Sequence, residues 1–286
     1  MLRFVRGLIL CSLVSASVFA CGGSSDPDQI AFVVGGDWEI FVMDVDGSNV
    51  RQLTNESGAV RDQPSWSPDG EQISYAGFLN DNYQIFVMDA DGTNVRQLTN
   101  VDGINWYPAW SPNGRQIAFQ SNRDGDMEVF VMNADGTNVR QLTTNDDSDV
   151  NPAWSPDGKE IAFTSDRDGD MEVFVMDANG NTVRQLTTND DWDTSPAWSP
   201  NGEQIAFING GDVYSEIFVM DVYGTNVRQL TTNDDSDWYP AWSPDGKQIA
   251  FVSDRYGVYY EIFVMDADGT NVRQLTEEGI EVVYKP

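Results

Sequence analysis

Aspartate is the residue type that recurs most regularly in this sequence at spacings suited to chemistry. Pairs such as Asp44 and Asp46, or Asp89 and Asp91, place two carboxylates two residues apart, as calcium-binding loops do. In an EF-hand loop, however, a glycine is sixth and a glutamate twelfth, whereas here the glycine is fourth and no such glutamate follows. An Asp-Gly step is also what a tight hairpin requires, because its turn needs a residue with positive φ. The pairs are therefore interpreted as turns and not as metal ligands.

Other catalytic groups are scarce. The chain contains no histidine and two cysteines, so Ser-His-Asp triads and histidine-ligated metal sites are excluded. No G-x-S-x-G sequence is present either. Paired carboxylates remain, and glycosidases use such pairs. We expect no catalytic residue, and keep a carboxylate-based, sugar-active enzyme as a minor alternative.

The aspartate pairs belong to a repeat of about 44 residues. One tryptophan opens each copy, at intervals of 44 residues: Trp66, Trp110, Trp154, Trp198 and Trp242. The methionine of an Ile/Val-Phe-Val-Met run marks six copies: Met43, Met88, Met132, Met176, Met220 and Met265. A fixed period of this length, without a helical pattern inside it, is typical of blade architectures.

Each repeat contains four short apolar runs separated by Gly, Pro and Asp turns, which we label strands A to D. The third run, Ile-Phe-Val-Met, lacks polar alternation, as expected for a strand that is buried on both faces. In a propeller each sheet lies between two others, so its inner strands are buried in this way. The sequence thus predicts an all-β fold, a six-bladed β-propeller of four-stranded antiparallel blades.

The two ends of the repeat array predict how the ring closes. The first copy lacks strand A and begins at Gln29 with strand B, whereas the last copy is followed by residues 280–286. Val282–Pro286 aligns with the Pro-Ala-Trp-Ser-Pro of strand A. We therefore expect the C-terminal strand to supply strand A of blade one, which would cover two exposed sheet edges.

The repeated sequences WSPDGxxIAFxS and EIFVMDADGTNVRQLT resemble the Pro-Asp β-propeller repeat of the TolB family, a relative of the WD-type repeats. The resemblance extends over about residues 29–286. It implies a propeller fold and a role near the bacterial cell-envelope machinery. Propellers have many functions, so the resemblance is much less specific for function than for fold.

The N-terminal segment is typical of a secretory signal. Arg3 and Arg6 precede an uncharged run that ends at Ala20, and this run is too short to span a membrane. Ala20-Cys21 resembles the bacterial lipobox, whose cysteine is acylated. We expect residues 1–20 to be a lipoprotein signal peptide, Cys21 to be lipidated, 21–28 to be a tether and 29–286 the propeller. A secreted or soluble periplasmic protein is the alternative.

The composition restricts the possible partners. The net charge is −30, and it becomes more negative when Arg3 and Arg6 are removed with the signal. Nucleic acids and anionic lipid surfaces are repelled by such a charge. We therefore expect a monomer in the cell envelope that contacts the membrane only through its lipid anchor.

The D–A and B–C loops differ between repeats, whereas the strands are nearly constant. They carry many aspartates together with tryptophan and tyrosine, a combination found in protein hot spots and in sugar-stacking platforms. The predicted partner-binding residues are Trp106, Tyr107, Asp149, Trp192, Asp193, Asp237, Trp238, Tyr239 and Tyr256. No metal ligand is assigned. Calcium held by these carboxylates stays open as an alternative to solvated loop tips.

These observations favour a non-catalytic binding scaffold in the bacterial cell envelope. Its D–A/B–C loop face would dock an envelope protein or a peptide, and no cofactor is required. The alternative is a cell-surface glycan-binding module, assisted by calcium, that uses the same aromatic residues for stacking.

Overall fold

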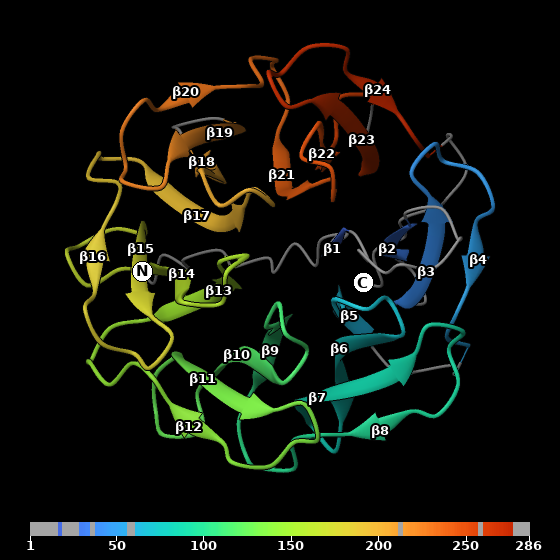
Figure 1. The fold of residues 1–286 in the computed structure, drawn as a ribbon, viewed down its shortest axis with the longest axis vertical. Helices are drawn as coiled ribbons and strands as arrows, with labels where there is room; N and C mark the ends of the chain where they lie inside the picture. The colour runs from blue at the N-terminus through green and yellow to red at the C-terminus, as the bar shows by residue number, and fades with distance from the viewer. Residues whose placement is uncertain are drawn as a thin grey trace, which may run out of the picture.

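The computed structural model describes residues 17–18, 29–34, 38–55, 61–210, 214–256 and 260–276. Six four-stranded antiparallel sheets surround a central axis, with the first strand of each sheet innermost and the fourth at the rim (Figure 1). The predicted all-β, six-bladed propeller is confirmed. No helix in the described part of the chain is long and apolar enough to cross a membrane.

The blades follow one another along the chain. The first three consist of β1 (Ser17–Val18), β2 (Gln29–Val34), β3 (Glu39–Asp44) and β4 (Arg51–Gln52); β5 (Arg61–Trp66), β6 (Gln72–Leu79), β7 (Asn82–Asp89) and β8 (Arg96–Gln97); and β9 (Asn105–Trp110), β10 (Gln116–Ser121), β11 (Glu128–Asn133) and β12 (Arg140–Gln141). The last three consist of β13 (Asp149–Trp154), β14 (Glu160–Ser165), β15 (Glu172–Asp177) and β16 (Arg184–Gln185); β17 (Trp192–Trp198), β18 (Gln204–Gly210), β19 (Ser215–Asp221) and β20 (Arg228–Gln229); and β21 (Asp237–Trp242), β22 (Gln248–Ser253), β23 (Glu261–Asp266) and β24 (Arg273–Gln274).

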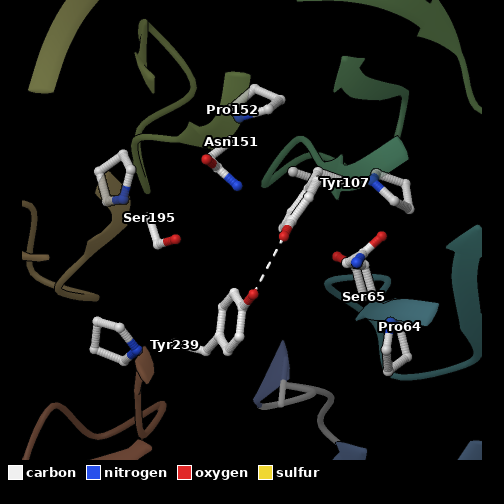
Figure 2. Close-up of a pocket in the computed structure, with 12 residues that line it drawn as sticks. Pro64, Ser65, Tyr107, Asn151, Pro152, Ser195 and Tyr239 are labelled. Carbon is white, nitrogen blue, oxygen red and sulfur yellow. Dashed lines mark hydrogen bonds between the residues drawn. The ribbon is translucent and has the colours of Figure 1, made fainter. Parts of the chain in front are cut away.

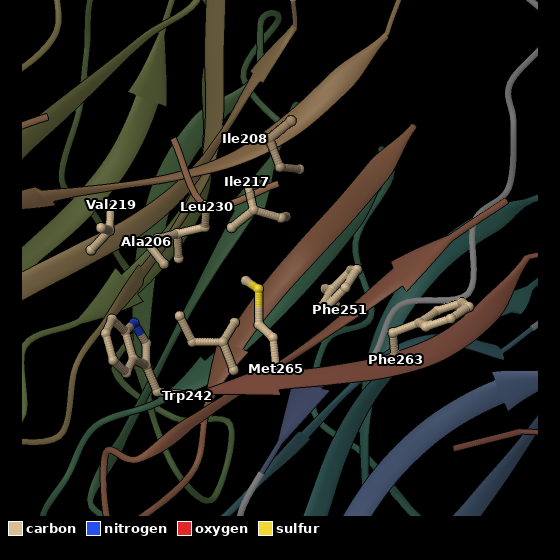
Figure 3. Packing of buried hydrophobic residues seen from close by; sticks show 10 residues of the cluster. Ala206, Ile208, Ile217, Val219, Leu230, Trp242, Phe251, Phe263 and Met265 are labelled. Carbon is tan, nitrogen blue, oxygen red and sulfur yellow. The ribbon is translucent and has the colours of Figure 1, made fainter. Parts of the chain in front are cut away.

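The hydrophobic core is divided among the spaces between blades. Between blades five and six, Ile208 and Ile217 lie in one cluster with Phe251 and Met265, and all four side chains are fully buried (Figure 3). Each such side chain contributes roughly 1.5–3 kcal/mol relative to an exposed one. The uninterrupted apolar run of the third strand is explained by this arrangement, because each of its faces packs against a different neighbour.

The ring closes through the same kind of packing. Ile30, Phe32 and Met43 of blade one form a cluster with Val252 and Ile262 of blade six. The apolar faces of the first and last blades therefore cover each other.

The innermost strand of blade one comes from the N-terminal segment. Ser17–Val18 (β1) pairs antiparallel with β2, where strand A was expected. Residues 277–286, including the predicted closing strand Val282–Pro286, lie outside the described residues, as does Cys21. A chain cleaved before Cys21 would lack β1, so closure by the C-terminal strand stays a prediction for that form.

Polar contacts at the rim also link successive blades. Arg273 of blade six donates to the carbonyl of Val45 in blade one at 3.2 Å, and Arg184 donates to Val222 of the next blade at 2.8 Å. The neighbouring turn glycine, Gly47, has φ +88 and lies so close to blade six that an added Cβ would be 2.7 Å from the carbonyl oxygen of Leu275. Only glycine fits this position without strain.

Gly47→Ala is expected to destabilise the ring more than Gly125→Ala. Both glycines have positive φ, but a Cβ on Gly125 would meet nothing within 4 Å. The difference between the variants therefore reports the contact between blades six and one, and we expect about 1–2 kcal/mol, or roughly 3–6 °C in Tm. Thermal unfolding followed by circular dichroism measures both, and equal melting temperatures would contradict the closure contact.

Candidate functional site

The predicted binding face carries the D–A loops (98–104, 142–148, 186–191 and 230–236) and the B–C loops (122–127, 166–171 and the described parts of 254–260). Two of the aromatic side chains are displayed there. Trp192 is 42% exposed and Tyr256 is 66% exposed. Both are therefore accessible to a partner.

Two other tryptophans serve mainly to pack the blades. Trp106 is half-buried, with its ring centroid 4.6 Å from that of Tyr83 in blade two. Trp238 is also half-buried and lies between the clusters on either side of blade six. Its centroid is 5.9 Å from that of Trp192. Only part of each of these two indoles is available at the surface.

The three predicted binding aspartates are not displayed. Asp149, Asp193 and Asp237 are completely buried, in contrast to the expectation that they line an open face. Each stands at or next to the start of strand A, where its side chain points toward the preceding blade. From this position the carboxylates organise the space between two blades, and they cannot directly contact a macromolecule on the surface.

Each aspartate belongs to a buried polar network between blades. At the junction of blades five and six, Thr231 donates its hydroxyl to Glu216 at 2.5 Å and accepts the backbone N–H of Ile217. Burial raises the pKa of this glutamate to about 7, and the charge of Asp237 in the next blade acts in the same direction. Comparable Thr–Glu hydrogen bonds join Thr54 to Glu39 and Thr276 to Glu261.

An arginine from the B–C loop neutralises two of these aspartates. Arg167 Nη2 lies 2.9 Å from both carboxylate oxygens of Asp149. Arg255 binds Asp237 at the same distances. Buried charges require such partners, because a carboxylate without one would lose several kcal/mol of hydration free energy.

Three glutamates of these networks, Glu128, Glu172 and Glu216, hold their protons unusually strongly. Burial raises the pKa of Glu128 to about 7, and the charge of Asp149 acts in the same direction. The hydrogen bond from Thr143 partly opposes them, because it lowers the pKa. Burial raises the pKa of Glu172 to about 8, and Asp193 adds to this effect. The pKa of Asp193 is itself raised by burial. Glu172 and Asp193 therefore behave as a carboxyl pair that retains a proton near neutral pH.

The second feature is the central channel, which the innermost strands surround. Every described innermost strand after β1 contains a β-bulge. The pairing register shifts at each bulge, for example between Val150 and Ala153 of β13. The residue before the strand's proline has positive φ, between 48° and 54°, at all five positions: Gln63, Tyr107, Asn151, Ser195 and Tyr239. A bulge redirects a side chain, and proline is tolerated because the inner edge of the strand needs no hydrogen-bond donor.

Tyr107 and Tyr239, two of the predicted site residues, thus line the channel and not the loop face. They come from blades three and six, on opposite sides of the ring, and their hydroxyls are 3.4 Å apart (Figure 2). Burial raises the pKa of Tyr107 to about 12, and nearby Asp62 acts in the same direction. The Tyr107 hydroxyl therefore stays protonated, and with the Tyr239 hydroxyl it bridges the channel.

The tyrosines border a small cavity of about 180 Å³. Its lining is uncharged: Gln63, Pro64, Ser65, Tyr107, Pro108, Ala109, Asn151, Pro152, Ser195, Pro196, Tyr239 and Pro240. Sequence reasoning missed this site, although a signal exists. The residue before each Pro-Ala-Trp or Pro-Ser-Trp changes from repeat to repeat while the residues after it are nearly constant.

The structure also bears on metal binding. Among the residues that the structure describes, no group of three or more Asp, Glu or Cys side chains is arranged to hold a metal ion. The carboxylates of the loop face are divided between buried networks and separate exposed loops. The calcium alternative therefore gains no support from their geometry.

Comparison with known proteins identifies relatives by sequence and by fold. The sequence model of the TolB beta propeller domain matches residues 27–213 and 193–285. No curated protein matches the sequence significantly.

Solved structures show the same architecture. TolB from Acinetobacter baumannii is 23% identical, with a TM-score of 0.73 over 87% of this chain and 64% of that chain. A protein from Agrobacterium tumefaciens proposed to be a TolB is 20% identical, with a TM-score of 0.69 over 88% of this chain and 90% of that chain. An oligogalacturonate lyase in complex with manganese is 14% identical, with a TM-score of 0.63 over 91% of this chain and 78% of that chain. The chain thus spans less than two thirds of the Acinetobacter protein, and its fold occurs in enzymes as well.

The buried carboxyl pairs predict that stability decreases as the pH rises. The ordinary pKa of Glu172 is 4.5, and its value in the folded protein is about 8. Between these values the folded state keeps a proton that the unfolded state releases, so the free energy of unfolding falls from about pH 5 to pH 8. Glu172→Gln, which cannot ionise, should flatten this profile and stabilise the protein at pH 8 by on the order of 2 kcal/mol.

Chemical denaturation at several pH values measures this effect. Glu203→Gln is the matched control, because Glu203 is exposed. A wild-type protein that gains stability toward pH 8, or a Glu172→Gln profile as steep as that of the wild type, would contradict the buried, protonated pair.

Proposed function

This chain belongs to the TolB beta-propeller domain family, and from that premise we propose that it is a non-catalytic binding scaffold of the bacterial cell envelope. Its D–A/B–C loop face docks a protein or a peptide. The fold alone is compatible with many functions, so the proposal depends on what this face displays.

The observation that carries the proposal is the negative charge that the loop face exposes. Its loops expose acidic side chains in each described sector from blade three to blade six: Asp124, Asp146, Asp168, Asp190 and Asp234. The basic residues of the described loops, Arg123, Arg167 and Arg255, are turned inward and only partly exposed. The face therefore presents negative charge that is not neutralised at the surface.

The opposite face also exposes aspartates, such as Asp46, Asp91 and Asp135, but it carries basic side chains as well. There, exposed lysines pair with exposed aspartates, as Lys159 does with Asp157 and Lys247 with Asp245, both at 2.8 Å. The rim arginines, such as Arg228, bind backbone carbonyls of the next blade. A partner with basic side chains would consequently be attracted to the loop face.

Two exposed aromatic side chains make the loop face suitable for contact with a protein. Trp192 and Tyr256 combine apolar area with a polar group, as interface hot-spot residues commonly do. Trp192, tilted by 50° against Trp238, would also stack against a sugar ring. Glycan binding is for this reason the second candidate function.

The proposal also includes attachment to the membrane. Cys21 follows a segment typical of a lipoprotein signal, so Cys21→Ser should move the protein from the membrane fraction to the soluble envelope fraction. Cell fractionation and immunoblotting measure this distribution. A wild-type protein that is already soluble would support secretion without an anchor.

Site-specific photocrosslinking in intact cells tests the docking face. A benzophenone amino acid placed at Trp192 or Tyr256 should give protein adducts, because these exposed side chains lie on the loop face. The matched control is Tyr223, which is 79% exposed in a C–D turn on the opposite face. Mass spectrometry identifies the captured protein.

The possible results separate the two functions. Adducts at Trp192 or Tyr256 and none at Tyr223 would support docking of a protein on the loop face. Equal labelling of all three positions, or no protein adduct at either loop-face position, would overturn it. Retention of a glycan on an array by the wild type, lost in Trp192→Ala, would then favour the sugar-binding function.

A further inference from the structure

The central channel contains a cavity that docking on the loop face does not use. Its walls come from strand A of blades two to six, at the proline of each strand and the residues beside it. Ser65, Ala109, Asn151 and Ser195 in these walls are only half-buried, so solvent reaches the cavity. The space therefore lies within the described part of the propeller and is accessible to a small molecule.

The volume of the cavity suits a single ring. It is about 180 Å³. An engineered apolar cavity of about 150 Å³ in another protein binds benzene, whereas sites for drug-sized ligands begin at about 300 Å³. The channel cavity would thus hold one six-membered ring with its substituents.

The chemistry of the walls favours an uncharged ligand. The lining residues that the structure describes carry no charge. Asp62, whose charge acts on Tyr107, is not one of them; it is 4% exposed, and its carboxylate accepts hydrogen bonds from Gln63 N and Nε2 at 2.8 and 2.6 Å. An anion would find no positive group in this lining, and a cation would find no carboxylate. Because a charge that loses its hydration without a partner is strongly disfavoured, the cavity excludes ionic ligands.

Polar groups nevertheless surround the cavity. Gln63, Tyr107, Asn151, Ser195 and Tyr239 occupy the same position in five successive blades, one residue before the proline. All five have positive φ, so the β-bulge directs each of them in the same way. Their side chains thus approach the channel from different sides, as Figure 2 shows for the four that it labels. A ligand in the cavity meets hydrogen-bonding groups around its whole edge.

Some of these groups have hydrogen-bonding capacity left for a ligand. Within the described structure, the hydroxyls of Ser65 and Ser195 make no hydrogen bond. The Tyr107 and Tyr239 hydroxyls are 3.4 Å apart, which is longer than the roughly 2.5–3.0 Å of an O–H···O hydrogen bond. A ligand hydroxyl would replace this long contact with shorter hydrogen bonds and would reach the serine hydroxyls as well.

A pyranose sugar has the complementary chemistry. Its hydroxyl groups project around the edge of one six-membered ring, its C–H faces are apolar, and it carries no charge. Each hydroxyl both donates and accepts, which matches walls of hydroxyl and amide groups. The proline and tyrosine rings supply apolar contacts for its faces. A purely apolar ligand would leave the polar wall groups without partners in an enclosed space, which costs free energy.

We propose that the central channel binds one neutral pyranose ring, held by the hydroxyls of Ser65, Tyr107 and Ser195 and by the amide of Asn151. This site goes beyond the proposed docking function, because it is separate from the loop face and needs no protein partner. The side chains that form it lie between Gln63 and Pro240, so removal of the N-terminal segment would leave them in place.

NMR titration tests the class of ligand. The methyl glycosides of glucose, galactose and mannose are the neutral probes, and at least one of them should shift the amide signals of Asn151 and Ser195. The matched anionic probe is the methyl uronide of the same sugar, in which a carboxylate replaces the hydroxymethyl group. The 6-amino-6-deoxy glycoside supplies a cation at the same position. Both charged probes should bind at least tenfold more weakly.

A substitution taken from the repeat locates the site. Ser195→Tyr introduces the residue that blades three and six have at this position, with the same positive φ, so the backbone accepts it. The added ring should fill the cavity and abolish binding. Asn179→Tyr is the matched control, because it adds the same side chain at an exposed turn position where blade five has Tyr223. Binding by this control should be unchanged.

Two milder variants test the hydrogen bonds. Ser65→Ala introduces the alanine that the next four blades have at this position, and Tyr107→Phe removes one hydroxyl. Each should weaken binding about threefold to tenfold, the loss expected for one hydrogen bond. These variants decide the question if Ser195→Tyr does not fold, and unchanged binding by both would overturn the site.

Trp192→Ala distinguishes the channel from glycan binding on the loop face. Binding that is abolished by Ser195→Tyr and unchanged in Trp192→Ala would support the channel site, whatever the photocrosslinking shows. Loss of binding in Trp192→Ala with retention in Ser195→Tyr would overturn it and place the sugar on the loop face. A chain that binds none of the neutral glycosides, or binds neutral and charged glycosides equally, would also overturn the proposal.

Discussion

Every blade of this protein has two apolar faces, and only the neighbouring blades can cover them. A four-stranded sheet with the sequence Ile-Phe-Val-Met in its third strand would expose one face or the other if it stood alone. The clusters that join blade five to six, and blade six to one, show that burial in this fold is a property of pairs of blades. The ring therefore gains its stability only when it is complete, which explains why contacts at the junction of the first and last blades matter.

The same constraint places polar groups between the blades. Strand A of one blade begins against strand C of the preceding blade, so the residues at these positions meet in an enclosed space. The chain neutralises them in different ways, by Arg61 on Glu39, by Arg167 on Asp149 and by uncharged Gln84 with Asn105. Where neutralisation is incomplete, as at Glu172 and Asp193, burial raises the pKa of the carboxyls, and their protonation becomes coupled to stability.

Function in such a scaffold depends on where the repeats differ. The strands are almost interchangeable, but the loops of one face carry exposed aspartates together with Trp192 and Tyr256. The channel residues vary as well, and Tyr107 meets Tyr239 across the ring. A partner on the loop face would thus encounter a surface without sixfold symmetry.

Much of the architecture could be predicted from the sequence, because a period of 44 residues and an apolar third strand reflect local requirements that every blade must meet. The positions of single side chains could not be predicted in the same way. Asp149, Asp193 and Asp237 are acidic and lie beside loops, yet they are buried, because strand A turns them toward the preceding blade. Tyr107 and Tyr239 line the channel because a bulge redirects them. The sequence by itself determined the number of blades, their strands and the acidic character of the loops. The tertiary structure alone decided which of those residues face solvent, a neighbouring blade or the channel, since that depends on contacts between residues about 20 to 130 positions apart.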